Sequence, residues 1–436
     1  MKTLILGGGL AGVTLARLLF EKGDDVQVIE RESRIGGLCR SISIDGFTFD
    51  IGGSHIIFSR DTEVLSFMHQ ILGDNRDERN RDTRILYKKG YIPYPFENGL
   101  SELPREDCFF CLNEFIKTLV ASEKGELIPP ANFKDWIYQT FGKGIAESYL
   151  VPYNEKIWNY PLHQMSAHWV EDRVPRPPVE DIIKSAIGIK TEGYAHQAVF
   201  SYPKTGGIES LVTAIADPVK DRIRTGFTAA SLNRVGSQWE VSDGNEQIFA
   251  DRIISTLPLQ VLLPCLTDVP DRVTQAIGNL KYNSIACIGI GLEGETLPFS
   301  WMYLPEKCGS AANRISFPSG FSTLGAPPGC SSILAEITYN AGDSIDQMSD
   351  AEVVKSTIDA LAADGILDPA RVKTAVLVRH KFAYVVYDLN WQENIRIIRE
   401  YFDSIEISLV GRFSQFEYLN MDGIIRSVHD FVRSNQ

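Results

Sequence analysis

The chain has 436 residues, of which 44% are hydrophobic and 23% are charged. This composition is that of folded globular proteins and excludes a disordered or fibrous chain, and the length favours two or three domains. The net charge of −13 would repel nucleic acid and an anionic membrane surface, so an anionic ligand would have to be held by local arginines.

The cysteines and the apolar stretches bear on the cellular compartment. The seven cysteines are an odd, scattered set, which favours reduced thiols. The apolar stretch 3–20 contains glycines and Arg17 and lacks a cleavage site, and no stretch reaches the ~18 apolar residues of a membrane helix. We therefore expect a cytoplasmic protein without stable membrane insertion. Cys108 and Cys111 form a CxxC inside a helical pattern, so we expect core cysteines and no metal site.

The N-terminal residues follow the pattern of a βαβ unit. Residues 2–6 are a short apolar strand, residues 10–20 have apolar side chains at helical spacing, and residues 25–30 form a second strand. Between the first strand and the helix, residues 7–12 read GGGLAG and fit GxGxxG. This context predicts a dinucleotide-binding site, and a glycine turn without a ligand is the alternative.

Each glycine of this loop has a physical role in such a site. Gly7 allows a sharp turn, Gly9 lets the backbone approach a pyrophosphate, and Gly12 allows close helix packing. The helix N-terminus offers N–H groups to the phosphates. Glu30 ends the second strand, where a carboxylate bonds ribose hydroxyls.

The rest of the chain alternates between helical and strand patterns. Residues 115–187 are mostly helical and are broken at prolines, which indicates an inserted helical domain. Further on, β-branched or alternating stretches predict strands, and amphipathic spacing predicts two helices, the second with Asp422 or Asn420 as N-cap. The predicted strands are 239–241, 248–256, 286–292, 333–339 and 376–380, and the predicted helices are 350–364 and 424–433.

Two stretches after the second strand resemble flavoproteins. Residues 30–41 read ERESRIGGLCRS and resemble the E-x3-R-x-G-G-x3-R/S continuation of glutathione-reductase-type and amine-oxidase-type flavoproteins. After a predicted hairpin turn at Asp45 and Gly46, residues 49–55 read FDIGGSH and resemble the D-x-G-G-x-H stretch beside the flavin ring of that superfamily. The resemblance implies FAD rather than NAD as the cofactor.

A second set of segments resembles the UDP-galactopyranose mutases. Residues 94–98 (YPFEN) and 152–158 (PYNEKIW) are similar to the YPFQN and PYNxKVW segments of that family. Four further segments follow in the expected order, and the match covers almost the whole chain. They are residues 171–174, 202–208, 301–305 and 411–418, which resemble the GERV, FPxxGG, W-L-Y-F-P and GRFGxWxY segments.

The resemblance implies an α/β fold with three parts. The first is a Rossmann-type, glutathione-reductase-like FAD-binding domain, the second a helical insertion, and the third a substrate domain with a mostly antiparallel sheet. We expect residues 1–90, 195–262 and 405–436 in the first, 100–190 in the second, and 91–99 and 263–404 in the third.

The resemblance also implies an isomerase that uses flavin in an unusual way. In that family N5 of reduced FAD attacks the anomeric carbon of a nucleotide sugar, and pyranose becomes furanose without net redox change. The expected partner is a UDP-galactose-like nucleotide sugar, with a role in galactofuranose supply for cell-surface polysaccharide. NADPH or NADH is a candidate priming reductant, and a homo-oligomer is compatible with the sequence.

The resemblance assigns site residues by position. A leaving diphosphate needs arginine donors, and Arg173, Arg314 and Arg412 match the family's arginines, with surface ion pairs as the alternative. His55 would lie beside the ring, and the helix after residues 420–423 would stabilise the anionic reduced flavin. The implied cofactor-binding residues are Gly7, Gly9, Leu10, Ala11, Gly12, Glu30, Arg31, Gly37, Leu38, Gly53, Ser54, His55, Gly411, Arg412, Asn420, Met421 and Asp422.

Aromatic and amide groups would orient the nucleotide and the sugar. Core packing is the alternative for each of them, above all for Phe96 and Trp158, and Tyr387 could replace Tyr384 in this role. The implied substrate-binding residues are Tyr94, Phe96, Asn154, Trp158, Arg173, Tyr303, Arg314, Tyr384 and Tyr418.

The chain departs from the mutase pattern at three places. Ser54 separates the glycine pair from His55, Glu97 stands where an amide is usual, and the stretch around Tyr384 is altered. Another nucleotide sugar therefore remains open as the substrate. Two further hypotheses are an ordinary flavin oxidoreductase of the protoporphyrinogen oxidase, phytoene desaturase or amine oxidase type, and a degenerate flavoprotein kept for binding or assembly.

Overall fold

The computed structural model describes residues 1–170, 176–191, 199–305 and 309–435. It begins with the expected βαβ unit, which consists of β1 (Lys2–Leu6), α1 (Leu10–Glu21) and β2 (Asp25–Ile29). These strands lie in a five-stranded parallel sheet of order β19-β13-β1-β2-β9. The other three strands come from distant parts of the sequence and are β9 (Ile223–Arg224), β13 (Arg252–Ser255) and β19 (Ile407–Leu409).

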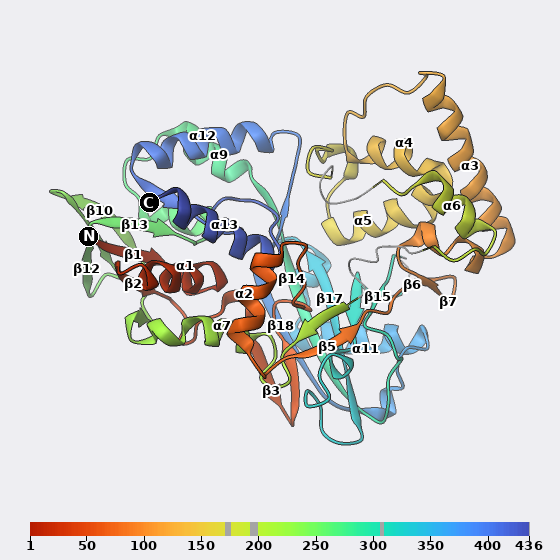
Figure 1. The fold of residues 1–436 in the computed structure, drawn as a ribbon, viewed down its shortest axis with the longest axis horizontal. Coiled ribbons are helices and arrows are strands. Elements are labelled where there is room, and N and C mark those ends of the chain that lie inside the picture. The colour runs from red at the N-terminus through yellow and green to blue at the C-terminus, as the bar shows by residue number, and fades with distance from the viewer. Residues whose placement is uncertain (171–175, 192–198, 306–308, 436) are drawn as a thin grey trace.

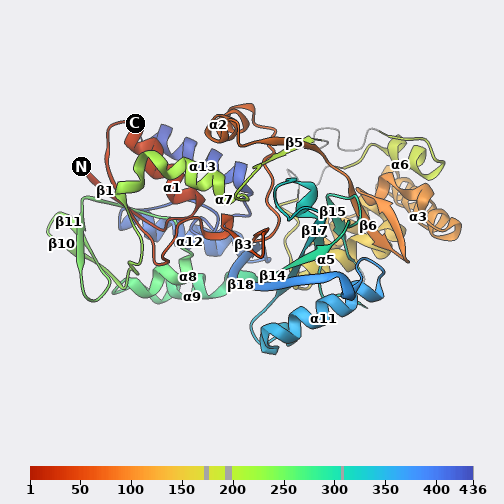
Figure 2. The same ribbon diagram turned by 90° about the horizontal axis from the view of Figure 1, so that it is seen from below.

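Helices and a β-meander cover this parallel sheet (Figures 1 and 2). α13 (Met421–Ser434) and α7 (Glu209–Ala216) contact α1, and α2 (Thr62–Leu72) contacts α7. On the other side, α9 (Asp271–Asn279) and α12 (Trp391–Ser404) share an apolar core with the meander. The meander consists of β10 (Ser231–Val235), β11 (Gln238–Ser242) and β12 (Gln247–Ala250), and a short helix, α8, spans Leu259–Leu262.

A hairpin and a small sheet connect this part to the rest of the chain. β3 (Ser41–Ile44) and β4 (Phe47–Asp50) form the hairpin predicted around Asp45 and Gly46. Both turn residues have positive φ, 51° and 82°, as a tight hairpin turn requires. β5 (Asp77–Asn80) pairs with β8 (Val199–Tyr202).

The large sheet has seven strands in the order β18-β14-β17-β16-β15-β6-β7, and its pairs are antiparallel except for β15 and β6. α11 (Asp350–Ala363) packs on one face, where Ile288, Ile315 and Ile337 form a core with it. The strands are β6 (Thr83–Tyr87), β7 (Gly90–Pro93), β14 (Lys281–Glu293), β15 (Trp301–Tyr303), β16 (Arg314–Ser316), β17 (Cys330–Tyr339) and β18 (Val372–Val386), and α10 (Ser344–Gln347) precedes α11.

The helical part lies beside the large sheet, away from the parallel sheet (Figure 1). α3 holds the CxxC, with Cys111 fully buried, and burial raises the pKa of that thiol to about 11. Among the described residues, no helix is both long and apolar enough to cross a membrane. The helices are α3 (Arg105–Glu123), α4 (Phe133–Ile145), a π-helical turn (Ala146–Leu150), α5 (Val151–Trp158) and α6 (Val179–Ala186).

One predicted element is wrong. The sequence predicts a single strand over 248–256, whereas the structure has two strands, β12 and β13, which belong to different sheets. The chain turns at Asp251, whose carboxylate accepts a 2.7 Å hydrogen bond from the backbone N–H of Lys2. The apolar residues of the two strands follow each other closely in sequence, and such a pattern cannot reveal a change of sheet.

Candidate active site

The glycine-rich loop leaves open space where a phosphate group would lie. A Cβ added at Gly12 would stand 1.9 Å from the carbonyl oxygen of Gly7, so Gly12 is required by the close contact of helix and strand. A Cβ added at Gly9 would meet no atom within 4 Å. Because Gly9 is also the N-cap of α1, this open space faces the positive end of the helix.

Glu30 lies directly after β2 and is bonded within the loop. One carboxylate oxygen accepts from the N–H of Gly8 at 2.7 Å, and the other accepts from the N–H of Glu32 at 2.9 Å. A carboxylate has further lone pairs, so these bonds fix its orientation and leave capacity for a ligand hydroxyl. Arg31 is exposed and pairs with Glu32 at 3.3 Å.

The other predicted cofactor segments converge on the same loop. Gly37 begins the short 3-10 helix that contains Leu38 and lies against Gly9, and Gly411 packs against the side chain of Ala11. Leu10 and Met421 lie in one apolar cluster. Asn420 is the N-cap of α13, and Asp422 accepts a 2.8 Å hydrogen bond from the hydroxyl of Ser59. The N-termini of α1 and α13 therefore lie near each other, although Leu10 and Met421 are 411 positions apart in sequence.

The face of the large sheet opposite α11 carries a row of polar side chains. Cross-strand pairing places Cys287, Glu336, Arg314 and Tyr303 side by side on β14, β17, β16 and β15. The guanidinium of Arg314 donates to both carboxylate oxygens of Glu336, from Nε at 3.0 Å and from Nη2 at 2.7 Å. Burial alone would lower the pKa of Arg314, but the carboxylate of Glu336 more than offsets this and holds that pKa above its usual range.

Arg412 lies among tyrosine rings. Its guanidinium carbon is 4.7 Å from the ring centroid of Tyr418 and 5.1 Å from that of Tyr384, which are cation–π distances. Nη1 also donates to the carbonyl of Leu419 at 3.3 Å. The rings of Tyr384 and Tyr418 are stacked with centroids 5.8 Å apart, and both contact Trp158 edge-on.

His55 lies within the electrostatic influence of both arginines. Its Nδ1 is 2.8 Å from the carbonyl oxygen of Gly53. Burial lowers the pKa of His55 to about 4, and the charges of Arg412 and Arg314 act in the same direction. The imidazole is therefore neutral at physiological pH, with its Nδ1–H directed to the Gly53 carbonyl.

A second group of rings lies near Arg314. Tyr303 contacts Tyr94 and Tyr153, with centroids 5.0 Å apart in both pairs. Tyr153 is not among the predicted site residues, although it directly precedes Asn154, and the charge of Arg314 acts on it. Phe96 is fully buried against Tyr149, as a core residue would be.

Asn154 is bonded within its own helix. Its Nδ2 donates to the carbonyl of Leu150 at 2.8 Å, and its Oδ1 accepts from Nε1 of Trp158 at 3.0 Å. Tyr387 is buried, and its hydroxyl accepts a 2.6 Å hydrogen bond from the N–H of Tyr418. Tyr384 therefore lies beside Arg412, while Tyr387 supports the backbone that carries Tyr418.

Three acidic or basic residues remain to be placed. Arg173 lies outside the described residues. Glu97 is buried, and its charge is one of the causes that raise the pKa of Tyr149. Glu336, like Tyr153, is a functional candidate that sequence reasoning missed, because a single glutamate in an apolar strand has no motif. Its one signal is that a charged residue interrupts a stretch of otherwise apolar or small side chains.

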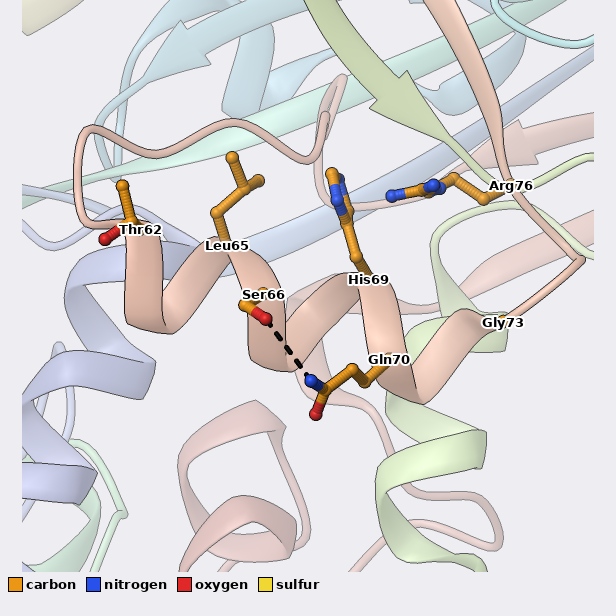
Figure 3. A pocket seen from close by; sticks show the side chains of 7 residues that line it. All are labelled: Thr62, Leu65, Ser66, His69, Gln70, Gly73 and Arg76. Atoms are coloured by element: carbon orange, nitrogen blue, oxygen red, sulfur yellow. Dashed lines mark hydrogen bonds between the residues drawn. The ribbon is translucent and has the colours of Figure 1, made fainter.

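A pocket on the surface of α2 is separate from this site (Figure 3). Leu65, His69 and Arg76 line it, and His69 lies against β8 through a 3.0 Å contact between its Nε2 and the hydroxyl of Ser201. None of the predicted site residues lines this pocket.

The parallel sheet, the glycine-rich loop and the large antiparallel sheet together define an FAD-binding flavoprotein fold. The chain belongs to the family of flavin-containing amine oxidoreductases, whose model matches residues 10–390. Over its whole length it is similar to a crystal structure of reduced UDP-galactopyranose mutase, with a TM-score of 0.91, 26% identity, and coverage of 100% of this chain and 93% of that one.

Two other comparisons agree with this family. It is 19% identical over 430 residues to the UDP-galactopyranose mutase of Mycoplasma pneumoniae, which covers 97% of this chain and 93% of that protein. A structure of putrescine oxidase bound to putrescine matches with a TM-score of 0.68 and 17% identity, over 100% of this chain and 99% of that one. The second likeness concerns the fold alone, whereas the mutase likeness extends over fold and sequence.

The residues present fit FAD, the cofactor that the family and the mutase likeness imply. Gly9 opens a cradle that a Cβ would fill, and the N-terminus of α1 faces it. Glu30 is held at the end of β2, where a ribose would be bonded. The N-terminus of α13 lies near the same loop and adds positive potential.

Proposed function

We propose that this chain is a flavin-dependent nucleotide-sugar mutase that interconverts the pyranose and furanose forms of a UDP-sugar similar to UDP-galactose. The observation that carries the proposal is that Arg314 and Arg412 both lie near Tyr384 and His55. Burial raises the pKa of Tyr384 and lowers that of His55, and the charges of the two arginines act to lower both pKa values. Two arginines beside aromatic rings suit a nucleoside diphosphate, whose charge needs bidentate donors and whose base needs flat surfaces. The likeness to UDP-galactopyranose mutases over the whole chain supports the same class.

When bound in its reduced form, FAD would supply a nucleophilic ring nitrogen, N5, to the anomeric carbon of the sugar. The role of the protein is to hold the leaving diphosphate, which Arg314 and Arg412 do by charge-assisted hydrogen bonds. Tyr303 and Tyr153 form an aromatic wall beside Arg314 for the nucleotide or the sugar. His55 is neutral, so it can accept a hydrogen bond at Nε2 without adding charge beside the flavin.

The context of the reaction is part of the same proposal. Because the isomerisation involves no net redox change, a reductant, NADPH or NADH, would be needed only to prime the flavin. We place the reaction in the cytoplasm, where it would supply galactofuranose units for cell-surface polysaccharide.

A direct assay tests the proposal. The purified holoprotein is reduced with dithionite and incubated with UDP-galactopyranose, UDP-galactofuranose and other UDP-sugars, and products are separated by chromatography. We expect interconversion of one pair by the reduced protein and none by the oxidised protein. Steady consumption of oxygen or another acceptor with an organic substrate, without sugar isomerisation, would instead favour an oxidoreductase of the amine oxidase type.

A further inference from the structure

Glu336 is a fully buried carboxylate at the centre of the candidate site. Its two oxygens accept the guanidinium of Arg314 in a two-point contact, while the side chain of Arg314 remains 20% exposed. A buried charge is costly unless it is paired, and this geometry pairs it fully. The contact also fixes the plane of the guanidinium and leaves its remaining N–H donors directed away from Glu336.

The same carboxylate holds the segment that carries His55. Oε1 of Glu336 accepts a 3.1 Å hydrogen bond from the backbone N–H of Ser54. A Cβ added at Gly53 would stand 3.0 Å from Oε2, and Gly53 has a φ of 98°, so the chain reaches the carboxylate only because this residue is glycine. The hydroxyl of Ser54 also donates to that of Ser316, which lies on the same strand as Arg314.

We propose that Glu336 is a positioning residue that joins Arg314 to the Gly53–Ser54–His55 segment, so that ligand binding at the arginine and the conformation of this segment are coupled. The proposal rests on the proposed function in one respect, namely that the ligand of Arg314 is a diphosphate. Glu336 itself faces the guanidinium and the backbone, and it acts on the ligand only through them.

The first experiment measures binding of UDP to the oxidised holoprotein by quenching of tryptophan fluorescence. In Glu336→Gln the carboxamide keeps the size of the side chain but cannot pair with both donors of Arg314. We expect binding to weaken by about tenfold with unchanged FAD content. The control is Asp350→Asn, which removes the exposed partner of Arg379 from the edge of the same sheet and should leave binding unchanged.

The direction of the effect discriminates between two roles. If the carboxylate only contributed negative charge near an anionic ligand, Glu336→Gln would tighten UDP binding. Tighter or unchanged binding would therefore overturn the positioning role.

In an Arg314→Ala background, Glu336→Gln should cause no further loss of UDP binding, because Glu336 acts through Arg314. An additional loss equal to that in the wild type would also overturn the positioning role.

The second experiment needs neither sugar nor nucleotide. Hydrogen–deuterium exchange of the peptide that contains residues 50–60 is compared in the holoprotein and in Glu336→Ala. We expect faster exchange in the variant, because the Ser54 N–H loses its acceptor, and unchanged exchange in a peptide from α11. Equal exchange at residues 50–60 would overturn the link to this segment. If the wild type neither binds UDP nor isomerises a UDP-sugar, the proposed function fails while this experiment still decides whether Glu336 holds the segment.

Discussion

The carboxyl of Asp50 lies at the end of β4, the imidazole of His55 lies five residues further on, and burial shifts both toward their neutral forms. The pKa of Asp50 rises from 3.8 to about 6 because of burial, although Ser41, Tyr202 and the N–H of Ile208 all donate to the carboxylate. The pKa of His55 falls from 6.5 to about 4, also because of burial.

These two shifts predict opposite contributions to the pH dependence of stability. For Asp50, stability present below pH 3.8 is lost as the pH rises toward 6. For His55, stability present above pH 6.5 is lost as the pH falls toward 4. In the wild type, the two contributions partly cancel as the pH falls. Asp50→Asn removes the contribution of Asp50, so stability should fall more steeply between pH 6.5 and 4, by up to about 1.4 kcal/mol per pH unit.

Urea unfolding at several pH values measures this slope. The matched variant is His55→Gln, for which acidification over the same window should cost less stability than in the wild type. Parallel curves for the wild type and both variants would contradict the assignment.

Arg412 provides a second prediction for a single residue. Arg412→Lys keeps the charge but loses the planar guanidinium that lies against Tyr384 and Tyr418. We expect turnover of the UDP-sugar to fall by about 10- to 100-fold with unchanged flavin content, measured by product chromatography and flavin absorbance. Arg396→Lys, which alters an exposed arginine between Glu393 and Glu400, should have no effect. Arg412 is also an implied cofactor-binding residue, and loss of flavin in Arg412→Lys would mean that this role, rather than contact with the substrate, accounts for the lost turnover.

Single elements position these residues for different physical reasons. The loop between β1 and α1 follows from local requirements, since Gly7 and Gly12 have steric reasons within the protein and Gly9 leaves the open space for a ligand. The row that contains Glu336 and Arg314 follows instead from the register of three antiparallel strands. A shift of that register by one residue would turn Arg314 into the core beside α11.

Gly9 and Gly12 allow a matched test of the loop. In Gly12→Ala the new methyl would collide with the carbonyl of Gly7, so the fold itself should be destabilised and the yield of soluble protein should fall. In Gly9→Ala the methyl meets no protein atom within 4 Å, so the apoprotein should fold normally but bind FAD at least about tenfold more weakly. Circular dichroism and flavin titration separate the two outcomes. Normal FAD binding by Gly9→Ala would show that the open space is not the phosphate site.

At the scale of the whole molecule, the helical part and the large sheet meet at α5. The side-chain amide of Asn283 on β14 donates to the carbonyls of Ile157 and Trp158 at 3.0 Å each. The hydroxyl of Thr338 on β17 donates to the carbonyl of Lys156. These bonds hold the end of α5, and with it Trp158, against the sheet that carries Arg314.

The joint formed by the hydrogen bonds of Asn283 and Thr338 to the end of α5 predicts a difference in stability between two substitutions. Asn283→Ala leaves two carbonyls in the joint without their donor and should cost about 2 kcal/mol. Thr338→Val keeps the shape of the side chain and removes one hydrogen bond, so it should cost about 1 kcal/mol or less. Thermal unfolding monitored by circular dichroism gives both values. An Asn283→Ala protein as stable as the wild type would contradict the role of Asn283 in the joint.

The sequence by itself determined the features that depend on near neighbours. The βαβ unit, the hairpin at Asp45 and Gly46, and the last helix all follow from periodicity and from backbone angles that few residues adopt. Of the two N-cap candidates of that helix, Asn420 and Asp422, the structure has Asn420 as the N-cap. The resemblance also indicated the family from the sequence, because ordered motifs over a whole chain carry more information than any one of them.

Only the tertiary structure decided which distant side chains meet. It placed Glu336 opposite Arg314, put Tyr384 rather than Tyr387 beside Arg412, and separated β12 from β13. Strand register and the choice of sheet depend on how the whole core packs, and the period of two along a strand is the same for every neighbour that the strand could have. The motifs could therefore name candidate residues for the site, whereas the contact that joins Arg314 to Ser54 through Glu336 became visible only in the folded molecule.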